Sequence, residues 1–181
     1  MKGAVFLDRD GTLVDDPGFI ARPEDVVLMA GAALAVRRLN QAGLPVIVVT
    51  NQSGLARGLI TPEQFERVTR EVSRLLEAEG ATVAATYYCP HYPPLTGACE
   101  CRKPGLLNYR LAAERFGFDL AASVYVGDRM SDLLPALSLG GRGILVRTGH
   151  GEETEAEAVA AGFESADDVD AAVSLILSDR A

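Results

Sequence analysis

Short apolar runs recur along the chain and alternate with longer segments of helical periodicity. The runs cover residues 4–8, 45–50, 85–89, 123–128 and 143–149, and each has the length of a buried strand. Strands separated by helices or long loops are typical of an α/β protein with a mainly parallel sheet. We therefore expect a Rossmann-like, doubly wound fold with three α/β/α layers.

The segments between these runs carry helix signals. Thr61 to Gln64 has the form of a capping box with proline at the first helical position, and apolar residues follow at helical spacing. Residues 31–43 carry Leu34 and Leu39 and end at Gly43, a typical stop. Further helices are predicted over 106–117, from about Ser131 with Pro135 as a candidate kink, over the acidic surface segment 150–162, and over 168–179.

The chain has 181 residues, which suffices for one domain with a sizeable core, and we expect residues 1–181 to form that single domain. Its composition, 48% hydrophobic and 23% charged, is ordinary for a soluble globular protein. No apolar run approaches the ~20 residues that a membrane span requires. The N-terminal residues lack the apolar region of an export signal, so we expect a cytoplasmic location.

The formal net charge of −8 limits the partners. A nucleic-acid backbone would require a basic surface, and an anionic substrate would require a cation to offset the repulsion. We expect a monomer that acts on a small molecule, with neither nucleic acid nor a membrane as partner.

The first apolar run ends in two carboxylates, Asp8 and Asp10, that flank an arginine. In an extended chain, residues two apart face the same side. Thr50 and Asp128 end the second and fourth runs, and the carboxyl ends of parallel strands line one crevice. Because Mg²⁺ prefers oxygen ligands and commonly contacts substrate phosphate, the sequence predicts a magnesium site there.

All three cysteines and one of the two histidines lie within residues 89–101, as Cys89, His91, Cys99 and Cys101. Two close pairs of Cys and His ligands match a closed, tetrahedral, structural zinc site. A disulfide with a spare thiol is the alternative, but a cytosolic chain disfavours disulfides and the odd count leaves one thiol over. We predict a zinc loop that fixes where the cations immediately after it, Arg102 and Lys103, point.

Four segments resemble, in order and spacing, the signature motifs of the haloacid dehalogenase-like phosphatases: FLDRDGT, VVTNQSG, CRKPG and VGDRMSD. The resemblance covers about residues 4–149 and implies phosphoryl transfer through an aspartyl-phosphate. Asp8 would attack phosphorus without an activating base, because a carboxyl with an ordinary pKa of about 3.9 is ionised at neutral pH. Asp10 would protonate the leaving group and then activate the hydrolytic water.

The same resemblance implies roles for other polar residues. The Thr50 hydroxyl and nearby backbone N–H groups would hold the phosphoryl oxygens, and Lys103 would balance the charge. Asp132 would support the metal site from one helical turn away, or merely cap a helix. The magnesium ligands would be Asp8, the carbonyl of Asp10, and Asp128.

The Cys/His loop narrows the resemblance to a group that contains heptose bisphosphate 7-phosphatases and histidinol-phosphate phosphatases, of which the heptose enzymes are more similar. Only about 20 residues separate Asp10 from the helix near residue 31, so we expect no large cap domain. A small phosphorylated sugar would then be held by loops, with Arg102 binding its remote phosphate. By analogy, the substrate contacts are Asp16, Pro17, Gly18, Phe19, Thr50, Asn51, Gln52, Ser53, Arg102, Lys103 and Arg129.

Three alternatives stay open on the sequence. A histidinol-phosphate phosphatase shares much of the pattern. A phospho-accepting signalling domain also carries an aspartate cluster on a doubly wound sheet, although Asp10 would hasten the hydrolysis that a signal must avoid. A zinc-dependent interaction module would keep its function in an Asp8→Asn variant. His150, the second histidine, is expected to be exposed and without a role.

Overall fold

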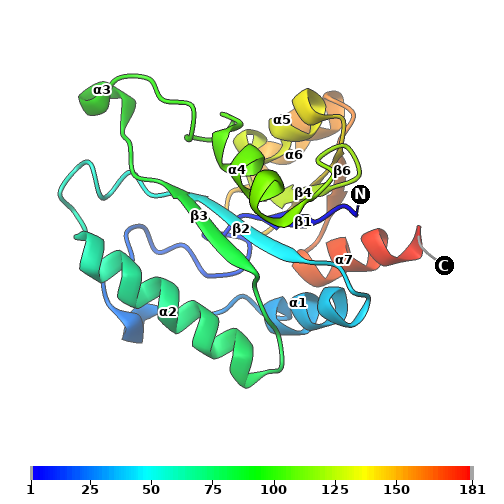
Figure 1. The fold of residues 1–181 in the computed structure, drawn as a ribbon, viewed down its shortest axis with the longest axis horizontal. Coiled ribbons are helices and arrows are strands. Elements are labelled where there is room, and N and C mark those ends of the chain that lie inside the picture. Colours follow the sequence, from blue (N-terminus) through cyan, green and yellow to red (C-terminus); the bar gives the residue numbers. More distant parts are fainter. Residues whose placement is uncertain (1, 180–181) are drawn as a thin grey trace.

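The computed structural model describes residues 2–179 of the protein. Its centre is a six-stranded sheet in the order β3-β2-β1-β4-β5-β6, and every neighbouring pair is parallel (Figure 1). The strand order runs outward from β1 in both directions, which places a crevice at the carboxyl end of β1. The strands are β1 (Val5–Leu7), β2 (Val46–Asn51), β3 (Ala85–Cys89), β4 (Val124–Gly127), β5 (Arg142–Val146) and β6 (Glu164–Ala166).

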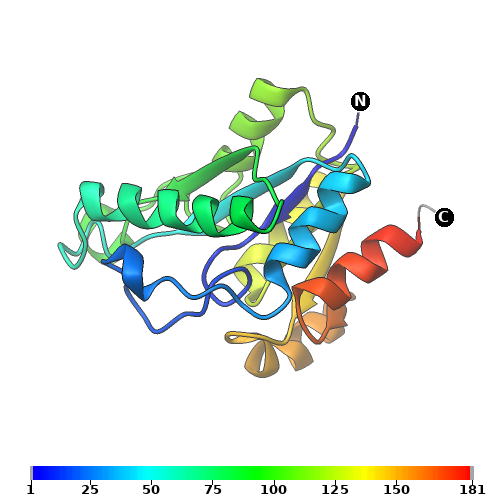
Figure 2. The same cartoon turned by 90° about the horizontal axis from the view of Figure 1, so that it is seen from below.

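Helices cover both faces of the sheet, so the predicted doubly wound, three-layer fold is confirmed (Figures 1 and 2). One face carries α1 (Ala32–Gln41), α2 (Pro62–Ala78) and α7 (Val169–Ser178). The other face carries α4 (Leu107–Phe116), α5 (Met130–Leu139) and α6 (Gly151–Ala160). Two short helices, η1 (Pro23–Asp25) and α3 (Pro93–Thr96), lie in connecting loops.

The apolar runs are continuous because both faces of the strands are buried. Successive strand residues face opposite sides: Val5 and Leu7 pack in the cluster with α1, α2 and α7, whereas Phe6 packs on the other face. The Phe6 ring lies 5.1 Å from Tyr109 and 5.2 Å from Tyr125, measured between centroids. These two layers hold the central strand rigidly.

Local sequence signals set the helix ends as predicted. Thr61 Oγ1 accepts a hydrogen bond from Gln64 N at 3.2 Å, and Gln64 Oε1 accepts one from Thr61 N at 2.8 Å, which completes the capping box of α2. Helix α1 stops just before Gly43, whose φ of 66° lies in the left-handed region. Pro135 lies inside α5, which continues through it to Leu139.

The structure differs from the hydrophobic pattern in a few places. The pattern does not predict β6, because this edge strand is only three residues long and contains Glu164 and Ser165. The run at 143–149 is a strand only as far as Val146. Leu34 is 43% exposed, and the buried face of its helix consists of Ala32, Ala35, Val36 and Leu39.

The connection between β1 and α1 positions the site without enclosing it. This stretch, all of it described, contains one short helix, η1, which agrees with the expected lack of a large cap domain. Among residues 2–179, no helix has the length and apolar character needed to cross a membrane.

Candidate active site

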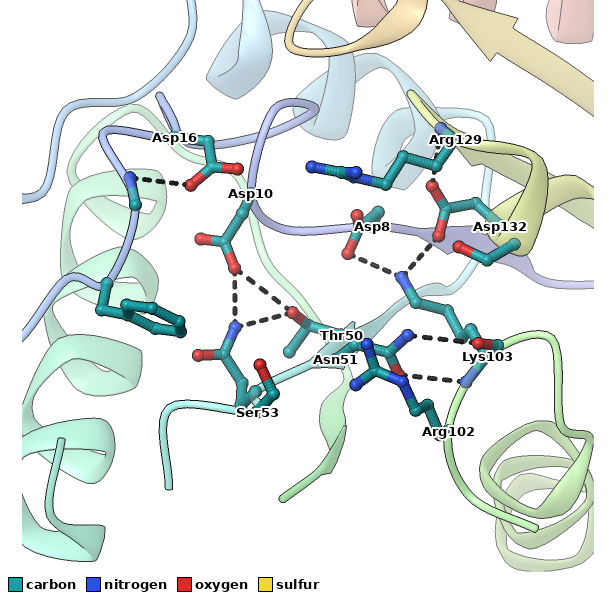
Figure 3. Close-up of a pocket in the computed structure, with 14 residues that line it drawn as sticks. Asp8, Asp10, Asp16, Thr50, Asn51, Ser53, Arg102, Lys103, Arg129 and Asp132 are labelled. Atoms are coloured by element: carbon teal, nitrogen blue, oxygen red, sulfur yellow. Dashed lines mark hydrogen bonds and ion pairs between the residues drawn. The ribbon is translucent and has the colours of Figure 1, made fainter. Parts of the chain in front are cut away.

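Asp8 lies directly after β1, at the carboxyl edge of the sheet, and its Oδ1 is held by two donors. The Arg9 N–H donates to it at 2.7 Å, and Lys103 Nζ lies 2.7 Å away (Figure 3). Lys103 Nζ also lies 2.7 Å from Asp132 Oδ1 and donates to the Val49 carbonyl at 2.7 Å. Because Lys103 is only 4% exposed, these contacts fix its charge between the two carboxylates.

Three carboxylates meet beside this lysine. Oxygen atoms of Asp8, Asp128 and Asp132 all lie within 4.8 Å of one another, which brings together residues 120 positions apart. Asp128 is completely buried: its Oδ2 accepts a hydrogen bond from the His150 backbone N–H at 2.8 Å, and its Oδ1 has no hydrogen-bond partner within the described residues. A buried carboxylate oxygen without a donor suits a hard cation, so the residues fit Mg²⁺.

Glycines allow this packing around Asp128. A β-carbon on Gly149 would lie 2.3 Å from Asp128 Oδ2, and one on Gly11 would lie 2.5 Å from the same atom. Both glycines also have positive φ, which other residues rarely adopt. His150 therefore contributes through its main chain, contrary to the expectation that it has no role, while its side chain is 44% exposed. No motif in the sequence signals this main-chain contact.

The charge balance explains why a cation fits. Burial raises the pKa of Asp8 well above its ordinary value; Lys103 opposes this shift, and the carboxylates of Asp132, Asp128 and Asp10 add to it. Burial likewise raises the pKa of Asp128 to about 6, against the lowering effect of the His150 N–H. The expectation that Asp8 has an ordinary pKa is therefore wrong when only the groups of the protein surround it. A divalent ion would favour the ionised forms.

Asp10 lies on the cavity wall with its carboxylate bound from two sides. Arg9 donates from Nε to Oδ1 at 2.8 Å and from Nη2 to Oδ2 at 2.9 Å. Gln52 Nε2 donates to Oδ2 at 2.6 Å, and the Thr50 hydroxyl donates to the same oxygen at 3.4 Å (Figure 3). The Asp10 carboxylate is not in the group of three, which leaves its main-chain carbonyl as the predicted metal ligand.

A cavity of about 400 Å³ opens over these residues. Two of its lining residues, Ser131 and Asp132, were not among the predicted substrate contacts. Pro17 is in the predicted set but does not line the cavity, and Asp128 lies buried outside its wall. The predicted catalytic residues Asp8 and Asp10 line the cavity, together with the predicted substrate contacts Asp16, Gly18, Phe19, Thr50, Asn51, Gln52, Ser53, Arg102, Lys103 and Arg129.

Asp132 caps a helix, one of the two roles that the sequence left open, and it also pairs with Lys103. Its Oδ2 accepts the Arg129 N–H at 3.0 Å and so caps the start of α5, while its Oδ1 lies against Lys103. Arg129 is thereby placed at the helix start, next to the carboxylates, with its side chain lining the cavity (Figure 3).

The predicted metal loop brings Cys89, His91, Cys99 and Cys101 together, with one donor atom of each within 4.8 Å of the others. The Sγ–Sγ distances are 3.2 to 3.6 Å, and the His91 Nδ1–Sγ distances are 3.2 and 3.6 Å. A disulfide would need about 2.05 Å, and tetrahedral ligands at about 2.3 Å from zinc would lie roughly 3.7 Å apart. All three cysteines are free, so the cluster could hold a metal.

This loop is tied to the cavity. Asn51, at the end of β2, accepts the Lys103 N–H at 3.0 Å and donates to the Lys103 carbonyl at 3.3 Å. Arg102 Nη1 donates to the His91 carbonyl at 3.3 Å, and its side chain lines the cavity. Arg102 is therefore in contact with the Cys/His loop, and Lys103 is held by β2.

Comparisons with known proteins agree with this geometry. A family described as HAD-hydrolase-like matches residues 100–172. The chain is 40% identical to D-glycero-beta-D-manno-heptose-1,7-bisphosphate 7-phosphatase of Haemophilus ducreyi over 162 residues, covering 86% of this chain and 89% of that protein. It is 39% identical over 165 residues to the Yersinia pestis protein of the same name, covering 87% of each chain.

A solved structure extends the likeness to the fold. The crystal structure of D,D-heptose 1,7-bisphosphate phosphatase from B. bronchiseptica, complexed with magnesium and phosphate, is 36% identical, with a TM-score of 0.89 over 99% of both chains. That of the Burkholderia thailandensis enzyme is 32% identical, with a TM-score of 0.73 over 98% of this chain and 99% of that one. The chain therefore belongs to the haloacid dehalogenase-like hydrolases, in the group that contains these heptose bisphosphate phosphatases.

Proposed function

We propose that the protein is a Mg²⁺-dependent phosphatase that removes the 7-phosphate of D-glycero-D-manno-heptose 1,7-bisphosphate. The observation that carries the proposal is the arrangement of Asp8, held by Lys103 at the floor of an open cavity, beside the buried Asp128 with an oxygen that lacks a donor among the described residues. The Haemophilus ducreyi and Yersinia pestis relatives carry the same activity in their names.

In this proposal Asp8 is the nucleophile. Its carboxylate oxygen forms a bond to phosphorus while the bond to the sugar oxygen breaks, and Asp10 gives that oxygen a proton. Asp10 then takes a proton from water, whose oxygen attacks phosphorus. The Asp8–phosphorus bond breaks, inorganic phosphate leaves, and both carboxylates return to their starting state.

The surrounding groups hold the charge that the reaction handles. Lys103 remains paired with Asp8 and Asp132, and the Thr50 hydroxyl faces the cavity to receive a phosphoryl oxygen. Bound by Asp8, the Asp10 carbonyl and Asp128, Mg²⁺ would offset carboxylate charge and polarise the phosphoryl group. The buried carboxylates and cations would thereby replace the water molecules that surround the phosphate and Mg²⁺ in solution.

The other end of a bisphosphate substrate would meet Arg102 and Arg129, two guanidinium groups on the cavity wall. A guanidinium pairs with a phosphate through two parallel hydrogen bonds, so these residues favour a small sugar with two phosphates. Asp16 and Phe19 also line the cavity, and the sugar hydroxyls would lie against them.

We further propose that zinc occupies the Cys/His cluster and that its role is structural. Four protein ligands of the Cys₃His type leave no position for a reacting water. The loop is short, with three prolines and mostly exposed residues, so metal bonding rather than a core would offset the entropy lost on ordering it.

A substrate panel tests this function. With Mg²⁺, kcat/KM for heptose 1,7-bisphosphate should exceed that for histidinol phosphate, and equal or reversed preference would contradict the substrate assignment. Asp8→Asn should lower kcat by at least ~10³, as expected when a covalent nucleophile is lost. An Asp8→Asn protein that keeps its activity would rule out the aspartyl-phosphate route.

A further inference from the structure

Arg9 lies between the two principal carboxylates in the sequence, but it does not line the cavity. Its guanidinium pairs with Asp10 through two parallel contacts, Nε to Oδ1 at 2.8 Å and Nη2 to Oδ2 at 2.9 Å. The side chain is only 3% exposed. Burying a charge is costly unless it is well paired, so this arginine is stable there because it binds Asp10.

Apart from Asp10, the Arg9 guanidinium has few partners. Its Nη1 is buried and has no hydrogen-bond partner in the described structure. Its Cζ lies over the Phe65 ring, 5.8 Å from the centroid, and Phe65 is in the first turn of α2, behind the capping box of Thr61 and Gln64. The guanidinium therefore also contacts an aromatic ring of the ordered helix α2.

On the cavity side, Asp10 is held by neutral donors. Gln52 Nε2 bonds to Asp10 Oδ2 at 2.6 Å and to the Thr50 hydroxyl at 2.9 Å. Of the described groups around the Asp10 carboxylate, Arg9 is the one that contacts both of its oxygens. Position and rotation of the carboxylate plane are therefore both set by Arg9.

We infer that Arg9 is a positioning residue that fixes the Asp10 carboxylate for proton transfer, an inference that rests on the acid role of Asp10 in the proposed function. A planar guanidinium fork fixes a carboxylate in a way that the point charge of lysine cannot. Proton donation requires the acid to lie within about 2.6–3.2 Å of the leaving oxygen. Losing the fork should therefore impair protonation of the leaving group while the phosphate-binding groups stay in place.

Two substrates with different leaving groups test the inference on the full-length protein. The sugar oxygen of heptose 1,7-bisphosphate is a poor leaving group that needs a proton, whereas 2,4-dinitrophenolate leaves its phosphate without one. In Arg9→Met and Arg9→Lys, kcat/KM for the sugar should fall by about 10²-fold or more, the size of general acid catalysis. For 2,4-dinitrophenyl phosphate the loss should be at least tenfold smaller, and Asp10→Asn should show the same split.

A matched control comes from a second arginine in a partly buried ion pair. Arg38, on α1, lies 2.6 Å from Asp170 Oδ1 on α7 and does not line the cavity. Arg38→Met should change the two kcat/KM values little and leave their ratio at the wild-type value. In addition, Arg9→Met combined with Asp10→Asn should be no slower on the sugar than Asp10→Asn alone, because Arg9 acts through Asp10.

Several outcomes would overturn the inference. Equal losses on both substrates would indicate a merely structural residue, additive losses in the double variant would indicate a role apart from Asp10, and undiminished activity would mean that the pairing does not help the reaction. If Arg9→Met does not fold, Arg9→Lys retains the buried charge and decides the question. A wild type inactive on both phosphates would overturn the proposed function together with the inference, whereas an active wild type with equal losses would overturn the inference alone.

Discussion

At the scale of single residues, the main feature of the site is an excess of buried carboxylates over buried cations. Asp8 and Asp128 are buried, and burial raises the pKa of both, while Lys103 is the only buried amine beside them in the described structure. Desolvation works against the charged form of Lys103, but Asp132 and Asp8 raise its pKa, so it stays cationic. One buried positive charge, on Lys103, does not neutralise the buried carboxylates around it. A divalent ion can offset the remaining negative charge.

The glycine beside Asp128 gives the first prediction. In Gly149→Ala the new β-carbon would collide with Asp128 Oδ2, so the carboxylate must turn away from the His150 N–H. We expect the Mg²⁺ concentration for half-maximal activity to rise about tenfold, equivalent to about 1.4 kcal/mol. Calorimetric titration of Mg²⁺ into the protein without substrate should give the same loss of affinity.

Gly162→Ala is the control for backbone strain. Gly162 also has a positive φ, 85°, but no described atom lies within 4 Å of the place that a β-carbon would take there. Both variants should lose stability by about 1–2 kcal/mol from the left-handed backbone, and only Gly149→Ala should alter the response to Mg²⁺. Equal Mg²⁺ responses in the two variants would contradict the steric argument.

Residues that contribute a reactive or charged side chain could be predicted from the sequence. Residues that contribute only a main-chain group could not. Asp8, Asp128 and Lys103 stand in motifs whose residue types fit metal and phosphate, and the structure brings them together. The contact of the His150 N–H with Asp128 depends on how two distant loops meet in the fold. No side-chain pattern encodes such a contact.

At the scale of elements, the Cys/His loop and β2 together hold one cationic wall of the cavity. Asn51 at the end of β2 binds both main-chain polar groups of Lys103, and Asn108 Nδ2 in α4 donates to the Cys101 carbonyl at 3.2 Å. These contacts fix the end of the loop. Its middle, including α3, is mostly exposed, and in the proposed function bound zinc orders it.

Removal of the metal from this loop gives a second prediction. Cys99→Ser, or chelation of zinc from the wild type, should release Arg102 and raise KM for heptose 1,7-bisphosphate at least tenfold, since a charged hydrogen bond contributes about 1.5–3 kcal/mol. The sheet should remain folded by circular dichroism. Zinc content by atomic absorption should follow KM.

Thr96→Ala is the matched control within the loop. The Thr96 hydroxyl bonds to the Tyr92 carbonyl at 2.9 Å, but Thr96 is not a candidate ligand, so this variant should keep both zinc and KM. Full activity with Mg²⁺ alone after complete removal of zinc would show that the metal does not order the loop.

The elements themselves follow the sequence closely where signals are strong. The capping box and its apolar spacing predict α2, and the run over residues 45–50 predicts β2. Strand β6 is not predicted from the sequence, because its three residues carry no apolar pattern. Their conformation depends on pairing with β5. Tertiary pairing, and not local preference, decides such short edge strands.

At the scale of the whole molecule, the active-site cavity and a group of stabilising ion pairs lie at opposite ends of the strands. The cavity lies at the carboxyl ends, whereas Arg142 begins β5 at the amino end and pairs with Glu164 at 2.6 and 2.7 Å and with Asp179 at 2.7 Å. These ion pairs connect β5 with β6 and with the end of α7. Substitutions there should affect folding without affecting the reaction.

Arg142→Met tests this separation. The variant should lose at most about 1 kcal/mol in urea unfolding at neutral pH, because the partners are partly exposed, and kcat/KM should stay unchanged. The hydrogen bond from Arg142 lowers the pKa of Glu164, so this stabilisation is present above the carboxyl's unfolded value of about 4.3 and fades as the pH falls through the lowered folded value. The two proteins should therefore converge in stability once the pH lies below the lowered pKa of Glu164, and a constant difference would argue against the ion pair.

The short connection between β1 and α1 leaves the cavity open to solvent. An enzyme that must swing a lid shut needs room for that movement, and packing in a crystal lattice restricts it. Here no such swing is required, so crystals soaked in heptose bisphosphate and Mg²⁺ should release inorganic phosphate into the mother liquor without cracking.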